Sequence, residues 1–171
     1  MAFLKQMKWG LAAVIFLLLA LLAGFFYFNY FGQEAGLSPD QIEIVEAFGP
    51  PTQFSIAYLP VGDDGEGSRF VREEKWFYPA AGMRLAFLSG RLVASDEMEL
   101  TNGEQYEKTS FRPQDFSYRT TVSDVRRLIG EAELAPMEVP GFFGDGVETC
   151  ACRKGVFVFE SGYLTYMQTL D

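Results

Sequence analysis

The sequence predicts an α+β protein, in which a single N-terminal transmembrane helix precedes two tandem repeats of a short helix and an antiparallel sheet. Three observations support this prediction. Residues 9–31 form a run of 23 residues without a charged side chain. Two later segments have the caps and apolar spacing of short helices, and each precedes segments with strand-like alternation. The motifs of the first helix-and-strand segment recur in the second.

The run 9–31 has the length of a membrane anchor. As a helix it would rise about 35 Å, and the hydrocarbon core of a bilayer is ~30 Å thick. Trp9 at one end, and Tyr27 and Tyr30 at the other, match the aromatic belts of the two interfaces. A cleaved signal peptide is the alternative, but residues 20–23 are a poor cleavage site. We therefore expect a retained helix that contacts membrane lipid.

The charges beside this run predict its orientation. Lys5 and Lys8 precede it, whereas the first charged residues after it are acidic, beginning with Glu34. The positive-inside rule places residues 1–8 in the cytoplasm and the following domain on the other side. The predicted location is the bacterial inner membrane, with a single span and a periplasmic C-terminal domain.

The composition restricts the chemistry of the predicted domain. The chain has 14 basic and 23 acidic residues, a net charge of −9, and no histidine. Acidity argues against nucleic acid as a partner. The absence of histidine excludes Ser-His-Asp catalysis and His-ligated zinc or haem. We interpret the densest acidic clusters, 73–74 and 96–99, as solvated strand edges, and we expect no cofactor, no metal site and no enzymatic activity.

Two cysteines occur in the chain, Cys150 and Cys152. Their spacing is not C-x-x-C, so it does not indicate a thioredoxin motif. On a strand the two side chains point to the same face. The alternatives are two packed thiols, a mutual disulfide, or a metal or redox role. A mutual disulfide would be strained, because extended Cα atoms two residues apart lie about 6.5–7 Å from each other.

The first predicted repeat occupies residues 32–100. Ser38 and Gln41 have the spacing of a capping box, and Gly49 follows the last apolar position of the helix. The apolar face of this helix consists of Ile42, Val45 and Phe48. Strands are predicted at 53–59, 69–78, 83–88 and 91–98, and the last two form a hairpin across Ser89-Gly90.

The second predicted repeat occupies residues 120–171. Its helix begins near Thr121 or Ser123 and ends at Gly130, and strands are predicted at 147–152, 155–160 and 163–169. Both helices have fewer than three turns and need a sheet to pack on.

The two repeats align through their glycines and hairpins. Gly49 corresponds to Gly130 at an offset of 81 residues, and the Ser89-Gly90 turn corresponds to Ser161-Gly162 at an offset of 72. The nine additional residues of the first repeat are assigned to a loop at 61–68.

Residues 101–119 are predicted to be a polar linker that carries aromatic residues. Aromatic residues make up 16% of the chain, and such residues often anchor protein interfaces. The alternative is that they fill two small cores. The candidate partner-binding residues are Trp76, Tyr78, Tyr106, Phe111, Phe116 and Tyr118.

The order of these motifs resembles a known architecture. Phe48-Gly49-Pro50, Trp76-Phe77-Tyr78 and the hairpin 87–92 follow one another, and Ile129-Gly130 and the hairpin 159–164 repeat part of the order. This pattern resembles the helix-plus-sheet repeat of the outer-membrane assembly lipoproteins (SmpA/OmlA family), and in tandem it is similar to the β-lactamase inhibitor protein family. The resemblance implies tandem sheets that present a surface to other proteins. Inhibition of β-lactamase is not carried over, since the predicted anchor departs from both families.

These features favour a binding or scaffold role. We expect a non-enzymatic, membrane-anchored accessory subunit that binds an integral-membrane or envelope protein on the extracytoplasmic face of a larger complex. Envelope-assembly, respiratory and photosynthetic complexes all fit this description. The alternatives are a tethered inhibitor-like domain that binds a soluble hydrolase, and a carboxylate-dependent envelope hydrolase. The latter requires two carboxyl groups about 5–9.5 Å apart in a cleft.

Overall fold

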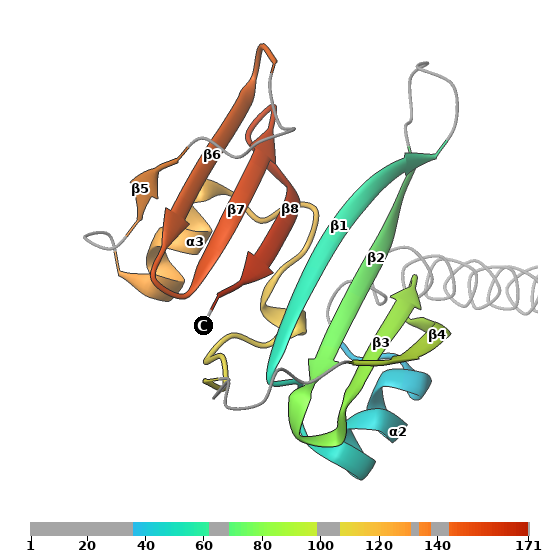
Figure 1. The fold of residues 1–171 in the computed structure, drawn as a ribbon. Coiled ribbons are helices and arrows are strands. Elements are labelled where there is room, and N and C mark those ends of the chain that lie inside the picture. Colours follow the sequence, from blue (N-terminus) through green and yellow to red (C-terminus); the bar gives the residue numbers. More distant parts are fainter. Residues whose placement is uncertain (1–35, 62–68, 99–106, 131–133, 138–143, 171) are drawn as a thin grey trace, which may run out of the picture. The chain divides into compact units, whose positions relative to one another are not determined.

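A computed structural model describes residues 36–61, 69–98, 107–130, 134–137 and 144–170 (Figure 1). The chain divides into two compact units, and all described residues except Gly36 belong to the second, Leu37–Asp171. The fold is therefore that of the second unit.

Within the described residues, this unit consists mainly of one eight-stranded antiparallel sheet with the strand order β4-β3-β2-β1-β8-β7-β6-β5. The strands are β1 (Gln53–Val61), β2 (Arg69–Tyr78), β3 (Met83–Leu88), β4 (Arg91–Glu97), β5 (Ala135–Pro136), β6 (Val147–Cys152), β7 (Gly155–Glu160) and β8 (Tyr163–Thr169). The helices are α2 (Pro39–Phe48), α3 (Val122–Ile129) and the short 3-10 turns η1 (Pro79–Ala81) and η2 (Pro113–Asp115).

The predicted α+β class with two separate sheets is therefore wrong, because the strands of both halves join into one sheet and the fold is predominantly β. β1 pairs with β8 through Ser55–Gln168, Ile56–Met167 and Ala57–Tyr166. The Thr169 hydroxyl extends this pairing, since it accepts from Phe54 N (2.9 Å) and donates to Phe54 O (3.1 Å). Separate sheets would leave two more edges of unpaired backbone groups. The individual strand positions were predicted nearly correctly, apart from β5, which was missed.

The predicted transmembrane architecture also requires correction. No helix among the described residues is long and apolar enough to cross a membrane. The helices α2 and α3 have ten and eight residues, whereas a span needs about 20. The run 9–31, with Trp9, Tyr27 and Tyr30, lies outside the described residues. The described chain thus gives no support for a transmembrane helix or for a single-pass location in the bacterial inner membrane.

Both α-helices begin and end as their sequences predict. Ser38 caps α2 in a capping box with Gln41, and Thr121 caps α3 in a capping box with Asp124. The hydrogen bonds from Thr121 lower the pKa of the Asp124 carboxyl group. Gly49 (φ 78°) follows α2 and Gly130 (φ 88°) follows α3, as predicted. In each case the glycine N–H donates to the carbonyl oxygen four residues earlier, which ends the helix.

The β3–β4 and β7–β8 hairpins have the same geometry. Ser89 (φ 49°) and Gly90 (φ 79°) form one turn, and Ser161 (φ 52°) and Gly162 (φ 84°) form the other. Positive φ at both positions is typical of the type I′ turn, whose twist suits an antiparallel hairpin. Each hairpin also has a register shift at equivalent positions, after Ala86 in β3 and after Val158 in β7. The predicted Ser-Gly hairpins are confirmed, and turn and bulge recur 72 residues apart.

Most of the described core lies on one face of the sheet, although buried Val158 of β7 lies on the other face, beside Tyr166. Residues that alternate along the strands point toward α2, α3 and the segment around η2, where Ile44, Val45 and Val125 pack against them. The strand residues of this core are Phe54, Ile56, Tyr58, Trp76, Tyr78, Leu85, Phe87, Cys150, Cys152, Phe157, Phe159, Leu164 and Met167.

Part of the predicted linker belongs to this core. The Phe116 side chain is fully buried. Its ring centroid lies 6.3 Å from that of Phe54 in β1 and 5.9 Å from that of Phe157 in β7. Phe111 packs edge-on against both Phe116 and Phe157. These two rings thus connect strands from the two halves of the sheet.

Replacing Gly49 or Gly130 by Ala tests the helix ends. Apart from its two chain neighbours, no described residue has an atom within 4 Å of the position that a Cβ would take on either glycine, so the cost arises from the backbone conformation. We expect each variant to lose about 1–3 kcal/mol of unfolding free energy, measured by urea denaturation. Ser123→Ala, at an exposed position in α3, serves as the control. Unchanged stability of both glycine variants would contradict these helix ends.

Replacing Phe116 by Ala tests the place of the linker in the core. Removing a fully buried phenyl ring should cost about 3–5 kcal/mol, and urea denaturation measures the loss. The matched control is Ser110→Ala, an exposed position in the same segment, which should stay within ~0.5 kcal/mol of the parent protein. Equal stability of the two variants would show that Phe116 lies outside the core.

Candidate functional site

The face of the sheet opposite the core carries a shallow hollow of about 200 Å³ over β2, β1 and β8. We call it the open-face hollow. It is lined by Ser55, Ala57, Glu73, Lys75, Phe77, Tyr166 and Gln168.

The hollow exists because the central strand has small residues between larger neighbours. The strand register forms two rows across the sheet, Lys75–Ser55–Gln168 and Glu73–Ala57–Tyr166. In each row the middle side chain is a serine or an alanine, so the floor is low and the side chains of β2 and β8 form the walls. Because β8 supplies one wall, the hollow requires the β1–β8 pairing.

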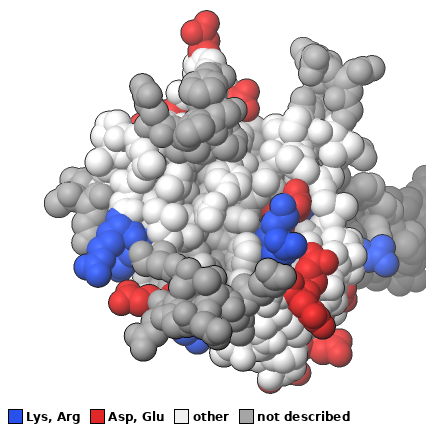
Figure 2. All heavy atoms as spheres, in the orientation of Figure 1, with Lys and Arg blue, Asp and Glu red and all other residues white. Residues whose placement is uncertain are grey.

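The walls combine aromatic rings with polar groups that pair with one another. The Lys75 Nζ lies 3.2 Å from Glu73 Oε1, and both side chains are partly exposed. The Tyr166 hydroxyl donates to Gln168 Oε1 over 2.7 Å. Burial raises the pKa of Tyr166, so its hydroxyl stays protonated at neutral pH. Half-buried Phe77 completes the lining. Figure 2 shows that uncharged residues make up most of the surface in that view and that charged groups are scattered among them.

The opposite face of β2 carries a buried charged network that fixes the linker to the sheet. Glu74 is buried and accepts from Arg72 Nε (2.9 Å), Gln41 Nε2 (2.8 Å) and Trp76 Nε1 (3.0 Å).

The guanidinium group of Arg72 also reaches the linker. Its Nη1 donates to the Phe116 carbonyl oxygen (2.6 Å) and its Nη2 donates to that of Pro113 (2.7 Å). The network therefore joins α2, β2 and the segment around η2, and its role is structural.

The structure places most of the predicted aromatic site residues in the core. Trp76, Tyr78, Phe111 and Phe116 are buried. Tyr118 is half-buried and stacks on Phe70, with ring centroids 4.0 Å apart. Tyr106 lies outside the described residues. None of the five that are described lines the open-face hollow. The alternative that aromatic residues fill the core is correct for four of them.

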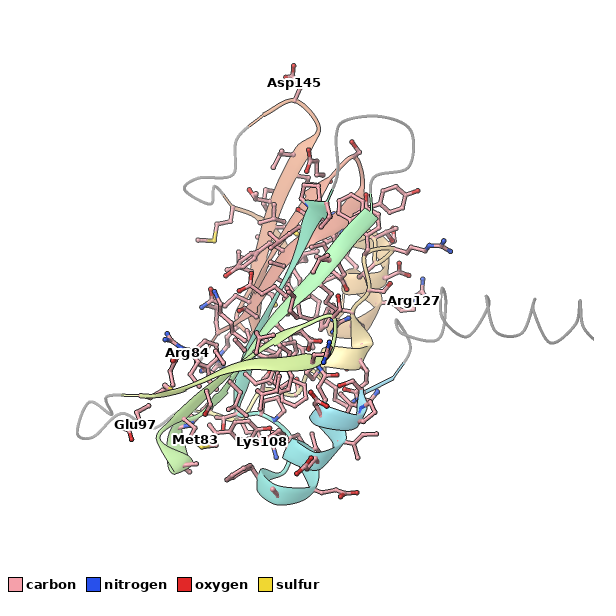
Figure 3. The ribbon with its side chains drawn as sticks, turned by 90° about the vertical axis from the view of Figure 1, so that its right-hand side faces the viewer. Met83, Arg84, Glu97, Lys108, Arg127 and Asp145 are labelled. Atoms are coloured by element: carbon pink, nitrogen blue, oxygen red, sulfur yellow. The ribbon has the colours of Figure 1, made fainter. Side chains whose placement is uncertain are left out.

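The two acidic clusters do not form carboxylate pairs in a cleft among the described residues. Glu73 and Glu74 are adjacent on β2 and therefore point to opposite faces of the sheet. Asp96 forms an exposed ion pair with Arg84, whose position is labelled in Figure 3.

Cys150 and Cys152 are both free thiols and both buried. They point into the core from β6, where Cys150 faces Phe157 across the strand pair. Burial raises the pKa of Cys150 to about 11, with a smaller contribution from the negative charge of Glu148. These features match the alternative of two packed thiols.

Sequence reasoning missed six residues of the hollow as site residues: Ser55, Ala57, Lys75, Phe77, Tyr166 and Gln168. The available signal was the alternation of β1, which puts Ser55 and Ala57 on the face opposite the apolar residues. No signal in the sequence indicated that β8 lies beside β1.

Comparisons with known proteins give no match for this chain among protein-family models, curated proteins or solved structures.

Thiol reactivity tests the environment of the cysteines. At pH 8 the Cys150 thiol is protonated, since its pKa is about 11, and both thiols are shielded from reagent. We expect slow reaction with a disulfide reagent such as dithionitrobenzoate in the folded protein, and rapid reaction of two thiols in guanidinium chloride. Rapid reaction of the folded protein, or no free thiol after unfolding, would contradict the assignment.

A matched pair of arginine variants tests the buried network. Arg72→Met leaves Glu74 buried without its cation, so we expect a loss of about 3–5 kcal/mol of unfolding free energy. Arg84→Met breaks an exposed ion pair and should cost about 0–1 kcal/mol. The unfolding free energies of both variants are measured by denaturation under the same conditions. A similar small loss of unfolding free energy in both would show that the network is not structural.

Proposed function

We propose that this protein is a non-catalytic binding domain that contacts a protein partner through the open-face hollow. The observation that carries the proposal is the asymmetry of the sheet: the described core covers one face, whereas the other face has a hollow with aromatic walls.

The size and lining of the hollow support a protein as the partner. Its volume of about 200 Å³ is below the ~300–1,000 Å³ typical of small-molecule pockets. A single inserted side chain suits this volume better. Phe77 and Tyr166 offer apolar contact to such a side chain, while Gln168 and the Glu73–Lys75 pair provide a polar rim. Aromatic anchors inside a polar rim are typical of protein interfaces.

A non-catalytic role is also consistent with the chemistry of the lining. Among the described residues that line the hollow, Glu73 provides the carboxylate and pairs with Lys75. Carboxylate-based hydrolysis would require a second carboxyl group at a suitable distance.

Filling the floor of the hollow tests the proposal. In Ala57→Arg a long side chain occupies the space between Glu73 and Tyr166. Tagged parent protein and variant are compared in affinity purification with quantitative mass spectrometry. We expect at least one partner protein to copurify with the parent. The recovered amount of that partner should be lower by about tenfold or more with Ala57→Arg.

Ser123→Arg, which adds the same side chain at an exposed position of α3 outside the hollow, serves as the control and should retain the partner. Circular dichroism must show that both variants are folded. Recovery of the parent as a free monomer, or equal retention by all three proteins, would contradict the proposed contact surface.

A further inference from the structure

A second recess lies where the turn between β6 and β7 meets the segment before η2 and the end of β8. Its volume is about 350 Å³, within the range of ~300–1,000 Å³ for small-molecule sites. We call it the basic recess. It is lined by Glu107, Lys108, Thr109, Ser110, Arg153, Lys154 and Leu170. Figure 3 shows Lys108 toward the end of the unit away from Asp145.

Backbone hydrogen bonds hold both walls of the basic recess. Leu170 N donates to the Lys154 carbonyl oxygen over 3.0 Å, which ties the turn to the end of β8. Thr109 N donates to the Thr52 carbonyl oxygen over 2.8 Å, which ties the other wall to the start of β1. The cations therefore project from positions that the sheet fixes.

The cations of the basic recess differ from most others in the described chain. Five of the basic residues that the structure describes form ion pairs, with partners within 2.7–3.2 Å. Among the described residues, no acidic group forms an ion pair with Lys108, Arg153 or Lys154. Of the described residues, three cations and one carboxylate, that of Glu107, thus line one recess in a chain of net charge −9.

We propose that the basic recess binds a small multivalent oxyanion, one that carries phosphate or carboxylate groups. Arg153 offers a planar fork of donors, and the two lysines add point charges, which is the donor set that such groups prefer. The hydroxyls of Thr109 and Ser110 line the same recess. The overall negative charge of the chain favours a small ligand. Nucleic acid or an anionic membrane would extend beyond the recess and meet other acidic groups of the chain, whereas a compact anion meets the local group of three cations and one carboxylate.

Titration calorimetry of the full chain tests this proposal with two probes, pyrophosphate for phosphate groups and citrate for carboxylate groups. Each titration is compared with sodium chloride at equal ionic strength. We expect saturable one-to-one binding of at least one probe, and the stronger of the two identifies the group that the recess prefers. Affinity should fall as sodium chloride is raised, because salt screens the charges.

The variants Lys108→Gln and Arg153→Gln/Lys154→Gln locate the binding. All the substituted side chains are exposed, so folding should be unaffected; thermal unfolding checks this. We expect affinity to weaken about tenfold or more in the double variant, and to stay unchanged in Arg91→Gln, an exposed control on β4 outside the recess. No saturable binding of either probe, or an equal loss in the control, would overturn the proposal without affecting the open-face hollow.

Discussion

The pairing of β1 with β8 is the interaction on which the rest of this structure depends. It consists of three residue pairs, extended by the two hydrogen bonds between Thr169 and Phe54. Without it the chain would have two four-stranded sheets, each with an additional exposed edge. The same pairs place Tyr166 and Gln168 beside Ala57 and Ser55. This β1–β8 junction therefore joins the two halves of the sheet and also creates the open-face hollow.

A short strand pairing needs support, and the linker supplies it from the core side. The Phe116 ring packs between Phe54 of β1 and Phe157 of β7, so burial of one side chain stabilises both halves of the sheet. Arg72 holds the linker backbone through the Phe116 and Pro113 carbonyl oxygens. The buried charges and the apolar core therefore act on the same junction, and the opposite face is left available for contact.

Local features of this fold could be predicted from the sequence, whereas the junction could not. Capping boxes, terminal glycines and Ser-Gly turns act over a few residues, so Ser38, Gly49 and Gly90 indicated their elements directly. The β1–β8 register joins residues more than 100 positions apart, and alternation along each strand does not reveal it. The repeated motifs predict two sheets, and this prediction makes Phe111 and Phe116 part of a linker. Only the register shows that Ser55 and Ala57 form a floor between larger neighbours.

The central claim is that both halves of the chain form one sheet and so create the hollow. Nuclear Overhauser measurements on the isotope-labelled full chain test this claim most directly. The account predicts backbone contacts between residues 55–57 of β1 and 166–168 of β8, in the register Ser55–Gln168 to Ala57–Tyr166. Contacts within each half, such as those between β1 and β2, with none between β1 and β8 would contradict it.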